Sequence, residues 1–129
     1  MRIEKNIKFI SVLLITLLIV LSIAGCSGGN SSEKFGVDIT EKKVVEVKDI
    51  FTSPNKYLNQ TFKLEGKIVR ECPSGCWFYL EDNTGTIFVD INPSGLTIPQ
   101  SIGKKVIVEG ELKSRNGRIF IIGRGVEII

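Results

Sequence analysis

The chain has 129 residues, 43% hydrophobic and 24% charged, so it is long enough for one small domain with its own core. It carries 17 basic and 14 acidic residues, and three of the basic and one of the acidic residues lie in the first eight positions. Without that start 14 basic and 13 acidic residues remain, a net charge of +1. This balance excludes the strong basic field by which many nucleic-acid-binding proteins are recognised.

The first 25 residues have the pattern of an export signal. Three basic residues precede an uncharged apolar run, and small residues stand directly before Cys26. The sequence IAGC resembles the lipobox of prokaryotic lipoproteins, in which the signal peptide is cleaved before a cysteine that carries the lipid. The resemblance implies a signal peptide over residues 1–25, lipidation of Cys26, a membrane partner and an extracytoplasmic location at the cell membrane. An uncleaved N-terminal anchor is the alternative, and it places the rest of the chain in the same compartment.

Residues 26–43 are rich in Gly, Ser and charged side chains and show little apolar periodicity, which predicts a flexible tether. Residues 44–129 then form one domain. At its start Val47, Ile50 and Phe51 have helical spacing, which predicts a short helix or turn.

From residue 61 the hydrophobic period becomes two, which is typical of β-strands. Five short strands are predicted, with the sequences TFKLEGKIVREC, CWFYLED, TIFVDI, KKVIVEGEL and RIFIIGRGVEII. DNTG and NG mark hairpin turns, and segment 92–103, with two Pro and two Gly, makes the connection between the third and fourth strands longer. This order, with glycines inside the first and fourth strands, predicts an all-β, five-stranded OB-fold barrel.

The stretch KLEGKIV…CWFYLEDNTGTIFVDI…IGKKVIVEGELKSRNGRIFI resembles the OB-fold nucleic-acid-binding domain of the tRNA-anticodon and replication-protein type, over residues 61–122. The resemblance implies the fold and a ligand face on the second and third strands, where Trp77 matches an aromatic residue that stacks on a base. It leaves the ligand open, because OB barrels host many ligands.

The alternation also predicts which side chains point outward. With Phe78 and Leu80 in the core, the aromatic side chains at alternate positions of two neighbouring strands share one outer surface. We predict a ligand-binding face that combines these aromatic residues with basic residues of the last hairpin. Its members are Trp77, Tyr79, Phe88, Lys113, Arg115 and Arg118.

Carboxylates on the same surface argue against nucleic acid. Glu81 stands where the family often has Arg, and Asp90 and Glu65 also point outward, so they would repel phosphates. Single-stranded nucleic acid therefore stays open but is not favoured over a peptide, a glycan, a small molecule or a partner protein. In the alternative interpretation, residues 44–60 or 92–103 cover the aromatic side chains.

Cys72 and Cys76 flank a three-residue turn, in a compartment where disulfides persist, and we predict a disulfide across the mouth of this hairpin. The alternative is a functional pair that binds Cu(I) or exchanges thiols. The CxxxC spacing is also seen in some extracytoplasmic copper chaperones of the respiratory chain. A third soft ligand would have to come from a partner, because the chain has no His and its only Met is the first residue.

The same lack of His removes the usual general base near neutral pH, and neither a carboxylate pair nor an activated Ser stands out. The sequence therefore predicts binding rather than catalysis, with no cofactor.

Overall fold

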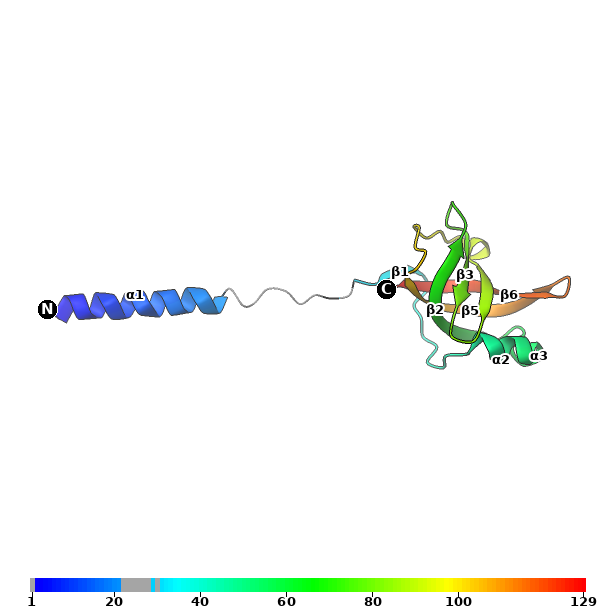
Figure 1. The fold of residues 1–129 in the computed structure, drawn as a ribbon, viewed down its shortest axis with the longest axis horizontal. Helices are drawn as coiled ribbons and strands as arrows, with labels where there is room; N and C mark the ends of the chain where they lie inside the picture. Colours follow the sequence, from blue (N-terminus) through cyan, green and yellow to red (C-terminus); the bar gives the residue numbers. More distant parts are fainter. Residues whose placement is uncertain (1, 22–28, 30) are drawn as a thin grey trace. The chain divides into compact units, whose positions relative to one another are not determined.

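The computed structural model describes residues 2–21, 29 and 31–129 (Figure 1). The chain divides into two units, one up to residue 30 and one from residue 31 to residue 129. The first unit contains helix α1, Arg2–Leu21, which covers the basic start and most of the apolar run of the predicted signal peptide. None of the helices in the described residues combines the length and apolar character that crossing a membrane needs. The predicted lipidation of Cys26 lies outside the described residues.

The second unit is mostly β and is built on one six-stranded sheet. Its short helices precede or connect the strands. The elements in chain order are β1 Glu33–Gly36, α2 Val47–Thr52, α3 Pro54–Tyr57, β2 Thr61–Glu71, β3 Trp77–Glu81, β4 Thr86–Asp90, η1 Asn92–Ser94, β5 Lys105–Arg115 and β6 Arg118–Ile128.

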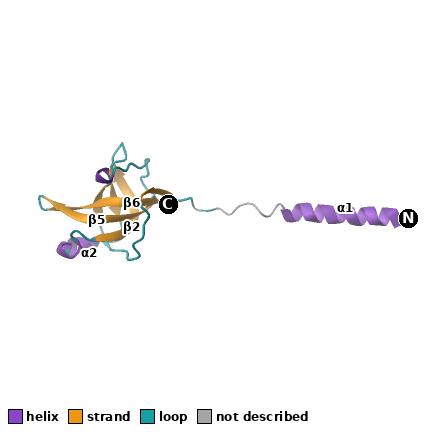
Figure 2. Ribbon diagram, turned by 180° about the vertical axis from the view of Figure 1, so that it is seen from behind, coloured by secondary structure: helices purple, strands orange, loops and turns teal. Residues whose placement is uncertain are grey.

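Five of these strands close on themselves in a ring. β2 pairs with β3, β3 with β4, β4 with β6, β6 with β5, and β5 returns to β2. The β4–β6 pairing is parallel and the other pairings are antiparallel. β1 lies outside the ring, where it pairs with β6. β5 and β6 form the longest hairpin of the ring (Figure 2). Of the predicted all-β fold, a mostly β domain with the five predicted strands in one ring is confirmed, and β1 is a sixth strand that the sequence analysis missed.

Two glycines let the long strands of the ring bend. A Cβ atom at Gly66 would lie 2.4 Å from the carbonyl oxygen of Glu81, and one at Gly110 would lie 2.5 Å from that of Ile122. No side chain tolerates such contacts, so only glycine fits at these two points. The strand register also shifts near each glycine, as the bulges and bends predicted from these glycines require.

The side chains that point into the ring form the core. Residues at alternate positions of β3 and β4 are almost completely buried, which is the pattern of strands with one face on a core. Helix α2 adds two fully buried side chains to the same cluster. These core residues are Phe78, Leu80, Ile87 and Val89 from the strands and Val47 and Ile50 from the helix. Each contributes on the order of 1.5–3 kcal/mol by leaving water.

Part of the predicted tether packs on the domain. β1 pairs with β6 along its whole length. Further along, Oε2 of the buried Glu109 accepts hydrogen bonds from the backbone N–H groups of Thr40 and Glu41 at 2.7 and 2.9 Å. The tether predicted over residues 26–43 is therefore corrected for residues 33–41. Its local composition is that of a linker, but its hydrogen-bond partners come from β5 and β6, far along the chain.

Replacing Glu109 tests this attachment. In Glu109→Ala both N–H groups lose a charged acceptor, and we expect the free energy of unfolding to fall by about 2–3 kcal/mol. Hydrogen exchange at the amides of Thr40 and Glu41 should speed up in parallel. Glu127→Ala, which removes a half-buried carboxylate from β6, is the control. An equal loss of protection in the control would show that Glu109 does not hold the segment.

Helix α2 is capped by the turn between β3 and β4. Asp82 Oδ2 accepts the N–H of Val47 at 2.9 Å, and Thr84 Oγ1 accepts the N–H of Lys48 at 3.0 Å. The other carboxylate oxygen of Asp82 accepts the backbone N–H groups of Thr84 and Gly85. Burial raises the pKa of Asp82, but the hydrogen bonds from Thr84, Val47 and Gly85 outweigh burial and hold this pKa below 3.8. A helix without a capping side chain of its own is thus fixed from a distant turn.

Asp82→Asn weakens this cap, and we expect it to lower the free energy of unfolding by about 0.5–2 kcal/mol at neutral pH. Because the folded-state pKa of Asp82 is depressed, its contribution is complete above the unfolded value near 3.8 and is lost as the pH falls through the folded value. Urea unfolding should show that the difference in free energy of unfolding between wild type and variant becomes smaller as the pH falls through this range. Asp49→Asn, on the exposed side of α2, is the control and should change the free energy of unfolding by less than about 0.5 kcal/mol at neutral pH.

Candidate binding site

Three aromatic side chains gather on the outer face of β3 and β4. Trp77 and Tyr79 flank the buried Phe78, and Tyr79 stands opposite Phe88 in the strand register. The ring centroids of Trp77 lie 5.9 Å from Tyr79 and 5.6 Å from Phe88, and those of Tyr79 and Phe88 lie 5.3 Å apart. All three side chains are partly exposed. The predicted outward orientation is confirmed, and the contacts among the rings account for part of their burial.

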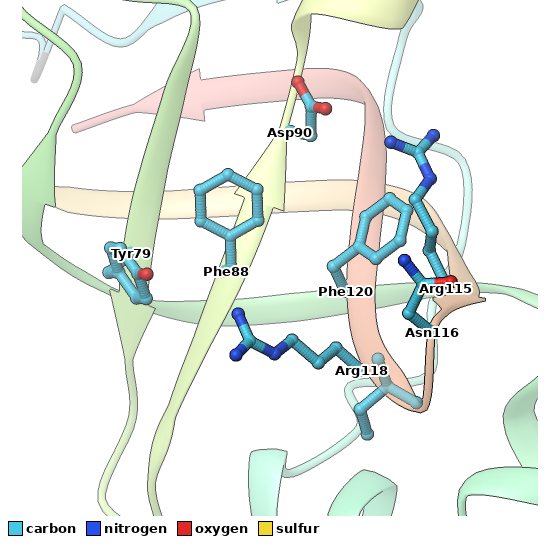
Figure 3. Close-up of a pocket in the computed structure, with 8 residues that line it drawn as sticks. Tyr79, Phe88, Asp90, Arg115, Asn116, Arg118 and Phe120 are labelled. Carbon is cyan, nitrogen blue, oxygen red and sulfur yellow. The ribbon is translucent and has the colours of Figure 1, made fainter.

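A groove of about 670 Å³ runs between these aromatic side chains and the β5–β6 hairpin. Tyr79 and Phe88 line one side, and Phe120 on β6 lines the other. Figure 3 shows Arg118 extending from the hairpin toward Tyr79 and Phe88, and Arg115 lying beside Phe120. The other lining residues are Asp90, Asn116 and Ile119.

Phe120 is a groove residue that the sequence analysis missed. The guanidinium carbon of Arg115 lies 5.6 Å from the centroid of its ring. Phe120 directly precedes the buried Ile121, and because side chains alternate along a strand, this position indicates an outward side chain on β6. Only the parallel pairing of β4 with β6, however, puts this position across from Phe88. The sequence pattern of each strand by itself does not reveal that pairing.

Among the described residues, none forms a salt bridge with the arginines near the aromatic rings. The guanidinium carbon of Arg70 lies 5.9 Å from the ring centroid of Tyr79, and Arg115 covers Phe120 in the same way. The salt bridges found in the described part of the chain join other residues, namely Lys63 to Glu65, Lys113 to Glu111 and Arg124 to Glu111. A guanidinium over an aromatic face keeps N–H donors for a ligand, so this surface offers unneutralised positive charge.

Two of the three carboxylates that argued against nucleic acid lie outside the groove. Glu65 pairs with a lysine at 3.6 Å, and Glu81 accepts a hydrogen bond from the Thr86 hydroxyl at 3.4 Å. Asp90 does line the groove, where it accepts the N–H of Asn92 at 3.1 Å. The lining thus holds two arginines against one aspartate, which favours a negatively charged ligand group.

Lys113, which was predicted to belong to the ligand-binding face, does not line the groove and contacts other residues. Its Nζ lies 2.6 Å from Glu111 Oε1 and donates to Asn59 Oδ1 at 3.0 Å. The hydrogen bond from Lys113 is the largest of the effects that lower the pKa of Glu111. The groove therefore contains four of the six predicted residues, and Trp77 packs against two of them. Those four are Tyr79, Phe88, Arg115 and Arg118.

A second cluster lies in the turn between β2 and β3. The Sγ atoms of Cys72 and Cys76 are 2.7 Å apart, and no disulfide joins them in this structure. Ser74 Oγ lies 3.1 Å from Cys72 Sγ and 3.7 Å from Cys76 Sγ. Hydrogen bonds from Cys76 and then Ser74 lower the pKa of Cys72 from 9.0 to about 6, and the same bond to Cys72 raises the pKa of Cys76. The predicted disulfide stays a prediction, with its two sulfurs already in contact.

The alternative of a Cu(I) site at these cysteines is not favoured by the arrangement. Across residues 2–21, 29 and 31–129, no group of three or more His, Cys, Asp or Glu side chains is placed to hold a metal ion. Two metal–sulfur bonds of about 2.3 Å at a tetrahedral or wider angle hold their sulfurs at least about 3.7 Å apart. Cys72 and Cys76 would therefore have to separate to bind an ion between them.

The thiol pair makes a prediction about titration. In the reduced protein we expect one thiolate to form with a midpoint near pH 6 and the second only above pH 9.0, followed by the ultraviolet absorbance of the thiolate. Cys76→Ala removes the main hydrogen-bond donor and should return the Cys72 midpoint toward 9.0. A midpoint that stays near 6 in this variant would rule out Cys76 as the cause.

No family model and no curated protein matches the chain. Its structure is similar to that of YgiW from E. coli, which is described as a hypothetical protein. The TM-score is 0.52 and the sequences are 19% identical, and the similarity covers 74% of this chain and 97% of YgiW. At this identity the likeness concerns the mostly β fold and carries no function from one protein to the other.

Proposed function

We propose that this chain is a membrane-anchored, extracytoplasmic lipoprotein whose domain binds a negatively charged ligand without catalysing a reaction. The observation that carries the proposal is the groove, in which Arg115 and Arg118 meet aromatic rings and form no salt bridge within the described residues. Charge-assisted hydrogen bonds from guanidinium groups are among the strongest in proteins. The partly exposed rings beside them offer a surface for a flat or apolar part of the same ligand.

The order of the ring supports its assignment to the OB fold. When the ring is numbered from β2, its first strand pairs with the second, β3, and with the fourth, β5. Its third and fifth strands, β4 and β6, pair in parallel. The groove then lies on the second and third OB strands and the hairpin between the fourth and fifth. OB folds bind oligonucleotides and oligosaccharides on this surface.

The leader supports the proposed location. The basic start and the apolar run of α1 precede the sequence IAGC, which is typical of lipid attachment at Cys26. A lipid on Cys26 would hold the domain at the extracytoplasmic side of the cell membrane through the short remaining linker. Multiple acyl chains give stable anchoring, whereas one chain binds a membrane only marginally.

The charges of the groove narrow the ligand class. An anionic peptide, glycan or small molecule fits two arginines and a single carboxylate. Single-stranded nucleic acid is less favoured, because Asp90 would face a phosphate chain and the mature chain has a net charge of only +1. Binding without catalysis is supported by the composition, since the chain has no His and the groove has one carboxylate only.

The test measures binding of anilinonaphthalene sulfonate, an anionic aromatic probe, to the full chain in detergent. Arg118→Ala should weaken binding about tenfold or more, because a hydrogen bond to a charged group is lost. Arg124→Ala is the matched control, since this exposed arginine is paired with Glu111 and does not line the groove. We expect its affinity to stay within about twofold of the wild type.

Equal losses in the two variants, or no saturable binding by the wild type, would overturn the groove as the site. Binding of a short single-stranded oligothymidylate, measured at rising salt concentration, tests whether the protein binds nucleic acid. The electrostatic part of such binding is strongest at low salt, so no binding there excludes nucleic acid and leaves the other anionic ligands.

A further inference from the structure

The turn that carries Cys72 and Cys76 is held rigidly. The N–H of Cys72 donates to the carbonyl of Trp77 at 2.9 Å, and the N–H of Gly75 donates to the carbonyl of Cys72 at 2.9 Å. Gly75 has φ +74, and a Cβ atom there would lie 2.0 Å from the carbonyl oxygen of Ile98, whose N–H donates back to Gly75. These backbone hydrogen bonds fix the turn that places the two cysteines side by side.

The two sulfurs have different surroundings. Cys72 is 9% exposed and has the Ser74 hydroxyl 3.1 Å from its sulfur, whereas Cys76 is partly exposed and lies farther from that hydroxyl. An incoming molecule thus meets Cys76 first. A negative charge on Cys72 is stabilised by the neighbouring thiol and hydroxyl, which is why the pKa of Cys72 is lowered to about 6.

We propose that Cys72 and Cys76 form an exchangeable disulfide that oxidises the dithiol of a substrate, with attack on the exposed Cys76 sulfur and departure of Cys72. This activity goes beyond the proposed function and does not depend on the groove. The disulfide itself arises by exchange with a more oxidising disulfide, such as oxidised glutathione. The substrate class is a dithiol, either of a small molecule or of a polypeptide outside the cytoplasm.

Each step balances. A substrate thiolate attacks Cys76 Sγ, forming a mixed disulfide, and the bond to Cys72 breaks with its electron pair on Cys72, which leaves as a thiolate. The second substrate thiolate then attacks the substrate sulfur of the mixed disulfide. Cys76 leaves and takes up a proton, so the substrate gains a disulfide and the protein becomes a dithiol. One protein disulfide is consumed for each substrate disulfide formed.

The unequal surroundings of Cys72 and Cys76 decide which sulfur leaves and which redox form of the protein is favoured. During attack the Cys76 sulfur has no S–H to donate, so the Ser74 hydroxyl, 3.1 Å from Cys72 Sγ, is the group that stabilises Cys72 as the leaving thiolate. Stabilisation of the Cys72 thiolate also favours the reduced protein. A thiol pKa of about 6 in place of 9.0 shifts the equilibrium toward the reduced form about tenfold at pH 7. A disulfide that only staples the hairpin would instead resist reduction.

The experiment uses the full chain in detergent with Cys26→Ser, so that Cys72 and Cys76 are its only thiols. The oxidised protein is equilibrated with mixtures of reduced and oxidised glutathione at pH 7, and the reduced fraction is read from alkylation and mass. Fluorescence of Trp77, the only tryptophan of the chain, follows the same change next to Cys76. Acid quenching and peptide mass spectrometry then show which cysteine carries the glutathione.

We expect the wild-type disulfide to be reduced by glutathione and the trapped glutathione to sit on Cys76. Ser74→Ala removes one stabilising hydroxyl, so this variant should need several-fold more reduced glutathione to reach the same reduced fraction. Ser114→Ala, an exposed hydroxyl in the distant hairpin, is the control and should match the wild type.

Three results would overturn the proposal. They are a disulfide that stays oxidised at every glutathione ratio, glutathione trapped on Cys72, and equal behaviour of the Ser74 and Ser114 variants. None of these results bears on probe binding in the groove. The redox proposal and the binding proposal can therefore fail separately.

Discussion

The close approach of strand backbones at Gly66 and Gly110 is the constraint on which the domain depends. At these points a Cβ atom would lie within 2.5 Å of a carbonyl oxygen in the neighbouring strand, so β2 and β5 can bend only because no side chain is present. The bends allow β5 to pair with both β2 and β6 and so close the ring. Closure buries one continuous core and brings β6 beside β4 in parallel, which sets Phe120 across the groove from Phe88.

Two segments outside the ring, α2 and the one that follows β1, donate backbone hydrogen bonds to carboxylates of the ring and its turns. Asp82 accepts the first N–H of α2, and Glu109 accepts two N–H groups of the segment that follows β1. An unpaired N–H group at a buried site costs about as much as a lost hydrogen bond, so each carboxylate fixes a segment that has few partners of its own. Both segments precede the ring in the sequence and are attached to it by side chains that follow later in the chain.

The cysteine turn directly precedes β3 and the groove is lined by Tyr79 in the middle of that strand, and the two proposed activities use different chemistry. Trp77 follows Cys76 directly, and its ring contacts those of Tyr79 and Phe88, which line the groove. Binding in the groove depends on guanidinium charge and aromatic surface. Exchange at the turn depends on two sulfurs of unequal exposure. Trp77 thus lies between the thiol turn and the aromatic side chains that line the groove.

The sequence by itself determined the five strands of the ring, the outward side of Trp77 and Phe88, and the juxtaposition of two cysteines across a tight turn. These are local properties, because the pleat of a strand repeats every two residues and a turn joins neighbours in the chain. Tertiary structure alone decided that Glu109 holds the segment after β1, that Phe120 completes the groove and that Lys113 is diverted to a carboxylate. The first two depend on partners many residues away, which strand pairing selects and local composition does not encode. Lys113 contacts Glu111 on its own strand, but its second partner, Asn59, is 54 residues away in the sequence.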